Sequence, residues 1–167
     1  MVTQQPTSGD DWASLRFMIG KWVGEGGEEG GGGPGMGSGY FTLREDLQGK
    51  VLVRKNRADY PATQDSPAYS HEDLMVIYRD ITSPAGHQLR AIYFDSEGHI
   101  INYSVEARHS EMGESVQFLS DVTPSSPSFR LTYTQIGTDT LALTFEIAPP
   151  GTPDTFSTYI EARVRRE

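Results

Sequence analysis

From Gly20 onward, apolar and polar residues tend to alternate along the chain with a period of two, which is typical of half-buried β-strands. The alternating segments are rich in Val, Ile, Tyr, Phe and Thr, the residues that favour strands. Strands are expected at residues 20–28, 38–47, 50–59, 73–80, 87–95, 99–108, 114–122, 129–136, 139–148 and 156–166. Because no long helix separates these segments, neighbouring strands should be antiparallel, and closing the sheet removes its exposed edges. The pattern therefore predicts an all-β fold, an up-and-down antiparallel barrel of about ten strands, with a two-sheet sandwich as the alternative.

A helical spacing precedes the first strand. Apolar residues recur at intervals of three and four from Trp12 through Leu15 to Met18 or Ile19, which makes one apolar stripe. An aspartate at position 10 or 11 would cap the helix by accepting hydrogen bonds from free backbone amides. The sequence therefore predicts a short helix that leads into the first strand.

Length, charge and composition limit the classes of partner. The chain has 167 residues, with 23 acidic and 14 basic side chains and a net charge of −9. This length suits one domain, which we expect over residues 11–167 behind a flexible segment at 1–10. Without a basic patch, neither a nucleic acid nor a membrane surface is an expected partner. The chain has no cysteine, no signal-peptide pattern near its start and no apolar run of membrane-spanning length, so we expect a cytoplasmic protein.

The hairpin predicted around residues 95–98 bears on which side chains face the barrel interior. Its bulkier face, which we expect to point inward, carries Arg90, Ile92, Phe94, Ile101, Tyr103 and Val105. A change of one residue in register would reverse this assignment. Apolar side chains left on the outer face would favour a homodimer.

Eleven of the 18 glycines fall within residues 20–39. Gly30, Gly32 and Gly35 match the spacing of a dinucleotide-binding fingerprint, but a strand-like segment follows them where that fingerprint needs a helix. We therefore interpret the stretch as a flexible connection between the first two strands, or alternatively as a mobile flap over the barrel mouth.

Strand arginines and two histidines are the candidate ligand contacts. Arg54, Arg90 and Arg130 lie within predicted strands, and an arginine that faces a barrel interior would recognise a carboxylate or a phosphate. His71 and His99 would form a metal or heme site only if both face inward. His71, Glu72 and Asp73 cannot all converge, because adjacent strand residues point to opposite faces. The sequence shows no nucleophile elbow, and we assign neither catalytic nor metal-binding residues.

The segment Gly20–Gly26 reads Gly-Lys-Trp-Val-Gly-Glu-Gly, and it resembles the opening of nitrobindin-type heme-binding barrels. More broadly, it is similar to the calycin superfamily of lipocalins and fatty-acid-binding proteins, and the chain looks most like its bacterial members of unassigned function. The resemblance implies that Arg163 or Arg165 of the last strand stacks on Trp22 and closes the barrel. It also implies a heme ligand on the final strand, where Tyr159 stands in place of the family's histidine.

Together these observations predict a lipocalin-like barrel that binds a small apolar or amphipathic ligand and needs no cofactor. The candidate ligand contacts are Arg54, Arg90, Tyr103, Tyr159, His71 and His99. One alternative is a heme- or tetrapyrrole-binding protein similar to nitrobindin. The other is an enzyme with a histidine–carboxylate site at the barrel mouth.

Overall fold

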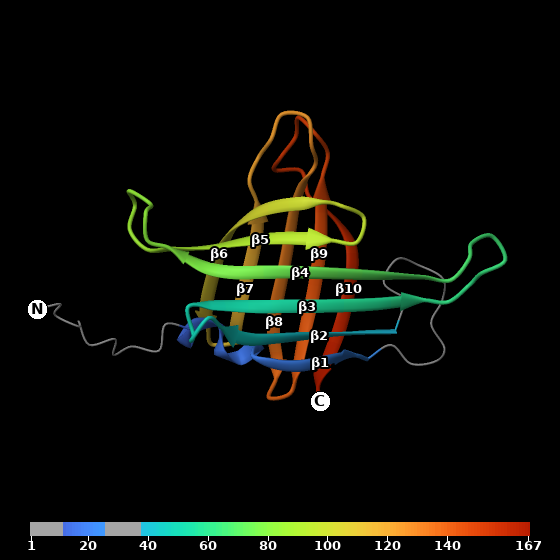
Figure 1. Ribbon diagram of the computed structural model, residues 1–167, viewed down its shortest axis with the longest axis horizontal. Coiled ribbons are helices and arrows are strands. Elements are labelled where there is room, and N and C mark those ends of the chain that lie inside the picture. Colours follow the sequence, from blue (N-terminus) through green and yellow to red (C-terminus); the bar gives the residue numbers. More distant parts are fainter. Residues whose placement is uncertain (1–11, 26–37) are drawn as a thin grey trace, which may run out of the picture.

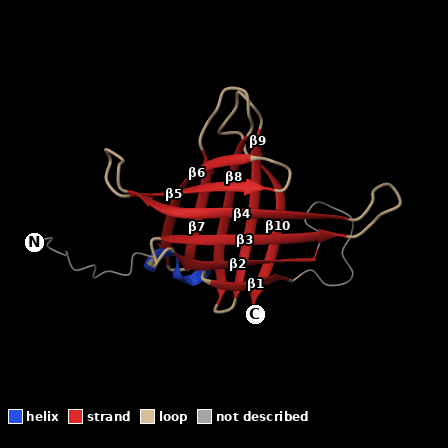
Figure 2. Cartoon of the chain, viewed as in Figure 1, coloured by secondary structure: helices blue, strands red, loops and turns tan. Residues whose placement is uncertain are grey.

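A computed structural model describes residues 12–25 and 38–167, which form a closed antiparallel barrel of ten strands behind one short helix (Figures 1 and 2). The elements are η1 (Ala13–Met18), β1 (Gly20–Gly24), β2 (Ser38–Asp46), β3 (Val51–Tyr60), β4 (Tyr69–Asp80), β5 (Gln88–Asp95), β6 (Ile100–Ser110), β7 (Gly113–Ser120), β8 (Ser128–Gly137), β9 (Thr140–Ala148) and β10 (Ser157–Arg166). Each strand pairs with its neighbours in sequence, and β1 pairs with β10 to close the ring. The predicted up-and-down barrel is confirmed, and the sandwich alternative is wrong.

Three predictions concern residues outside the described ranges: the flexible segment at 1–10, the aspartate cap of the helix, and most of the glycine-rich stretch. The helix itself is present as the 3₁₀ segment η1. Within the two described ranges, no helix combines the length and the apolar content needed to cross a membrane.

The η1 end of the barrel is filled by side chains. Leu15 and Met18 of η1 are fully buried and belong to the same apolar cluster as the barrel interior. The large side chains with less than 2 % exposure include Trp22, Leu43, Leu52, Met75, Ile77, Phe118, Tyr133 and Leu141. The half of the barrel next to η1 is therefore a packed apolar core.

Arg166 and Trp22 close the base of the barrel. The Arg166 guanidinium lies 4.3 Å from the centre of the Trp22 ring and donates hydrogen bonds to the backbone carbonyls of Ile19 (2.6 Å) and Phe17 (3.0 Å). The indole N–H of Trp22 donates to the carbonyl of Met18 at 2.8 Å. One cation therefore joins the last strand, the first strand and the helix.

The sequence prediction that Arg163 or Arg165 stacks on Trp22 is wrong. In β10 the even-numbered side chains face inward: Val164 is buried, and Arg166 is the residue paired with Trp22. Arg163 and Arg165 are exposed because they occupy the alternate positions of the strand. The arginine–tryptophan stack is present, but Arg166 makes it, because the prediction assigned the wrong set of alternate β10 residues to the interior.

The β5–β6 hairpin corrects half of the predicted inward face. Ala91 pairs with Tyr103, and Tyr93 pairs with Ile101, so the odd-numbered residues of both strands share the interior. Ile101, Tyr103 and Val105 point inward as predicted. Arg90, Ile92 and Phe94 point outward, which contradicts the prediction.

The length of the turn explains this error. The backbone N–H of Asp95 donates to the carbonyl of His99 at 3.3 Å, and that of Gly98 donates to the carbonyl of Asp95 at 3.1 Å. Gly98 has φ +92°, a left-handed conformation that glycine adopts without strain. The connection thus has a three-residue loop, a common hairpin type, and an odd loop pairs odd residues with odd residues.

Candidate functional site

The half of the barrel away from η1 encloses a cavity of about 820 Å³. One side of its lining is apolar and comes mainly from β6, β8 and β9. The apolar side chains there are Ile101, Phe129, Leu131, Leu143 and Phe145. Phe129 and Phe145 stack with their ring centres 5.9 Å apart, and Tyr159 meets Phe145 edge-on at 6.2 Å. These rings form the aromatic wall of the cavity.

The other side of the lining is polar and comes from β3, β4, β5 and the β5–β6 turn. We call it the polar wall, and its members are Arg54, Asn56, His71, Asp73, Tyr93, Asp95, Glu97 and His99. In the closed ring of strands, β4 lies across from β9, so the polar and aromatic walls face each other (Figure 1).

Arg54 and Asp73 form a buried ion pair in the polar wall. Their side chains are 6 % and 5 % exposed, and Asn56 donates a second hydrogen bond to the Asp73 carboxylate at 2.9 Å. The Arg54 guanidinium also lies 5.1 Å from the centre of the Phe41 ring. Burial alone would raise the pKa of Asp73, but the Arg54 charge holds it below its ordinary value. Arg54 faces the interior, which is the orientation that its role as a candidate ligand contact requires, but its charge is already balanced within the protein.

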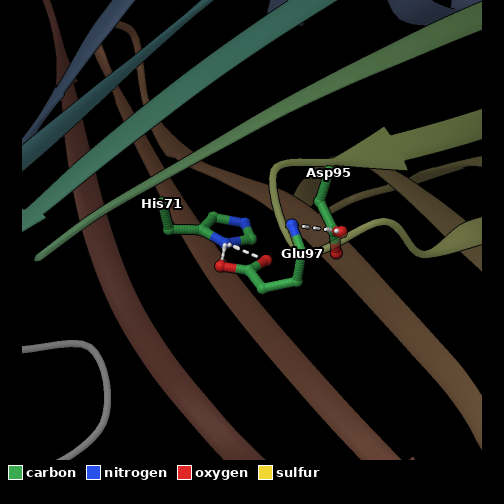
Figure 3. Close-up of side chains that lie close together, drawn as sticks. All are labelled: His71, Asp95 and Glu97. Carbon is green, nitrogen blue, oxygen red and sulfur yellow. Dashed lines mark hydrogen bonds and ion pairs between the residues drawn. The ribbon is translucent and has the colours of Figure 1, made fainter.

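His71 is the centre of the polar wall. Its Nδ1 is paired with the Glu97 carboxylate (Figure 3), at a distance of 2.8 Å. Its Nε2 lies 3.4 Å from Asp73 and 3.3 Å from the Tyr93 hydroxyl. The hydrogen bond with Asp73 and the bond with Glu97 raise the pKa of His71 to about 9. His71 is therefore a cation at neutral pH, and both of its ring nitrogens donate.

Asp95 extends this network through Tyr93 and His99. The Tyr93 hydroxyl donates to Asp95 at 3.3 Å, and His99 Nδ1 lies 2.8 Å from the same carboxylate oxygen. Burial raises the pKa of Tyr93, and the charges of Asp73 and Asp95 raise it further, so the hydroxyl keeps its proton. A continuous hydrogen-bonded chain thus runs from Glu97 through His71, Tyr93 and Asp95 to His99.

The same groups include a set of potential metal ligands. One atom each from His71, Asp95 and Glu97 lies within 4.8 Å of the others, and a nitrogen with two carboxylate oxygens is a donor set that divalent metals accept. In Figure 3, Glu97 bonds to His71 and its backbone N–H donates to Asp95, so the groups bond to one another. The predicted His71–His99 pair lines the cavity, but this set includes His71 without His99.

Strand alternation separates Glu72 from its neighbours, as predicted. His71 and Asp73 line the cavity, whereas Glu72 is exposed and bonds to Arg57 at 3.0 Å. The three adjacent residues therefore do not converge on one site.

Two of the three candidate arginines lie on the outer surface. Arg90 pairs with Asp121 at 2.6 Å, and Arg130 forms two hydrogen bonds with Glu146 at 2.6 and 2.7 Å. Neither lines the cavity, so the predicted inward orientation of Arg90, on which its role as a candidate ligand contact depended, is wrong. The reason is alternation again, because each arginine lies beside an inward residue of its strand, such as Ala91.

Both candidate tyrosines line the cavity, but at different depths. Tyr103 is 2 % exposed and meets Tyr93 and Phe118 edge-on at 6.4 and 6.3 Å. Tyr159 is 52 % exposed and lies at an irregularity where the β9–β10 register shifts, so it reaches the rim of the cavity.

The sequence reasoning did not assign Tyr93, Asp95 or Glu97 to the site. Tyr93 and Asp95 follow Ala91 at a spacing of two, so the three residues share one face of β5. The odd number of residues in the loop after Asp95 is what pairs this face with the inward residues of β6.

Comparison with models of known protein families and with curated proteins finds no match for this chain.

Proposed function

We propose that this protein binds a small, largely apolar ligand with one polar end inside its barrel. The observation that carries the proposal is the cavity of about 820 Å³ with an aromatic wall facing a polar wall. Cavities that are mostly apolar, with a few converging polar groups, are typical of small-molecule sites. The resemblance of the Gly20–Gly26 opening to the calycin superfamily supports the same function.

The aromatic wall would supply most of the affinity. Each 100 Å² of apolar ligand surface removed from water contributes roughly 2.5 kcal/mol before the costs of association. The stacked Phe129 and Phe145 rings offer a flat surface for the body of the ligand. Polar groups that are already held by hydrogen bonds, such as Tyr93 and His71, would fix the orientation of its polar end.

We do not propose heme as the ligand, because the described lining residues do not fit it. Both ring nitrogens of His71 are engaged, Nδ1 with Glu97 and Nε2 with Asp73 and Tyr93, which leaves none to bind iron. His99 bonds to Asp95 through Nδ1, and its side chain is 65 % exposed at the turn. The propionates of heme would also meet carboxylates in the lining, among them Glu97. Tyr159, at the position that corresponds to the family's histidine, lies at the rim against Phe145.

A matched pair of alanine substitutions tests the proposal. Ala162 lines the cavity, and its ladder partner Leu143 does too, whereas Ala142 lies one position away on the outward face of β9. We expect the fluorescent probe N-phenyl-1-naphthylamine to bind the unmodified protein with an increase in emission. Ala162→Phe should abolish this signal by filling the cavity, and Ala142→Phe should leave it unchanged. Equal binding by both variants, or no binding by the unmodified protein, would contradict the proposal.

A further inference from the structure

The charge of the cavity lining bears on the class of ligand. Among the described residues, four carboxylates line the cavity, from Glu25, Asp73, Asp95 and Glu97, whereas Glu161 borders it from an outward position of β10. They face one guanidinium group, that of Arg54, because Arg163 occupies an outward position of β10. Even if both lining histidines are counted as cations, four negative charges stand against three positive ones. The cavity therefore keeps a net negative charge in every protonation state of its histidines.

Arg54 does not provide a place for an anion. Its guanidinium is paired with the buried Asp73 and covered by the Phe41 and Tyr133 rings, 5.1 and 5.9 Å from their centres. A ligand carboxylate that approached Arg54 would also approach Asp73, whose side chain is 5 % exposed and charged. The Asp73 carboxylate thus occupies the position beside Arg54 that a ligand anion would need.

The aromatic side chains of the lining act in the same direction as the carboxylates. Nine lining residues are aromatic, and two pairs of them stack: Phe129 with Phe145, and Tyr60 with Tyr69 at 4.5 Å. The face of an aromatic ring carries partial negative charge and attracts cations. A cation inside the cavity would therefore meet carboxylates on one wall and ring faces on the other.

From these three observations we infer that the ligand is an organic cation: an amine with an apolar body. Its body would lie on the Phe129–Phe145 wall. Its ammonium group would approach the exposed side of Glu97, whose carboxylate is 45 % exposed although it also accepts from His71, whereas Arg54 and Asp73 are both buried. This inference rests on the proposed function, because it assigns a charge to the ligand of the same cavity.

Three ten-carbon compounds that differ in their polar end separate the inference from the proposed function. Decylamine, decanol and decanoate, each below its micelle concentration, compete with N-phenyl-1-naphthylamine for the cavity at pH 7. We expect decylamine to bind at least about tenfold more tightly than decanoate, since opposite and like charges a few ångströms apart differ by more than that factor. Decanol should fall between the two.

A matched pair of variants locates the effect. Glu97→Gln should reduce the preference for decylamine over decanoate to about threefold or less. Glu114→Gln is the control, because Glu114 also pairs with a histidine, His109, but lies outside the cavity. It should leave all three affinities unchanged.

The possible outcomes distinguish failure of the cationic-ligand inference from failure of the proposed binding function. If decanol or decanoate binds as tightly as decylamine, or if decylamine does not displace the probe, the inference is overturned while the proposed function stands. An equal effect of Glu97→Gln and Glu114→Gln would also overturn it, since the preference would then come from overall charge. If the probe itself does not bind the unmodified protein, the proposed function fails and the inference fails with it.

Discussion

Replacing Asp73 with asparagine should destabilise the barrel strongly, because it leaves the Arg54 charge buried without its partner. Arginine does not release its proton inside a protein, so Arg54 would stay charged at 5 % exposure. Breaking a buried ion pair on one side costs about 3–5 kcal/mol. Domains of this kind have a total free energy of unfolding of about 5–15 kcal/mol, so the loss is a large fraction of the whole.

Urea unfolding followed by circular dichroism measures this loss. With a slope near 2 kcal/mol/M, Asp73→Asn should lower the midpoint by roughly 1.5–2.5 M. The control is Asp121→Asn, which breaks the exposed pair with Arg90 and should cost about 1 kcal/mol or less.

A second substitution distinguishes an unpaired charge from lost packing. Adding Arg54→Met to Asp73→Asn removes the buried cation and keeps an apolar chain of similar length, so the double variant should be about 2 kcal/mol more stable than Asp73→Asn alone. A cost of less than about 1 kcal/mol for Asp73→Asn would refute the effect of an unpaired buried charge. Further destabilisation of the Asp73→Asn protein by Arg54→Met would refute it as well.

Two further predictions concern the base of the barrel and the polar wall. Arg166→Ala should lower the free energy of unfolding by about 2–4 kcal/mol, because it removes the stack on Trp22 and two hydrogen bonds to backbone carbonyls. The control is Arg165→Ala on the outward face of β10, which should change the free energy of unfolding by about 0.5 kcal/mol or less. Equal effects of the two substitutions would contradict the assigned strand alternation. The pKa of His71 is raised from 6.5 to about 9, so its contribution to stability should be complete below pH 6.5 and lost as the pH rises through 9. Unfolding of the unmodified protein and of His71→Asn across this range measures that contribution, and an identical slope for the two would contradict it.

The strand architecture could be predicted from local pattern alone. Alternation of apolar and polar residues locates ten strands, and the absence of long helices between them requires antiparallel neighbours. The predicted 129–136 and 139–148 lie within one residue of the observed β8 and β9 bounds. The largest difference at the start of a strand is in β4, which begins at Tyr69, because positions 69–72 are polar or exposed and carry no apolar alternation.

The orientation of side chains could not be predicted as well, because it depends on register. Residues 90 and 91 exchange inside and outside when a turn gains one residue, and the loop after Asp95 has three residues. The same kind of error placed the closing arginine at 163 or 165 in place of Arg166.

The contacts within the polar wall were harder to predict from the sequence than side-chain orientation, because they join distant parts of the chain. Arg54 and Asp73 are 19 residues apart, and His71 and Glu97 are 26 residues apart. No local pattern shows that an inward arginine already has its counter-charge inside the barrel. The sequence therefore suggests an anion-binding arginine, whereas the structure has a balanced pair within a lining of net negative charge.

Methyl NMR of the protein during titration with N-phenyl-1-naphthylamine tests the central claim most directly. The methyl groups of Ile101, Leu131 and Leu143 line the cavity, whereas those of Ile92 and Leu119 lie outside it. Binding inside the barrel predicts saturable shifts of the first three resonances and none for the other two. Shifts confined to Ile92 and Leu119, or no shift at a saturating concentration of the probe, would contradict the account.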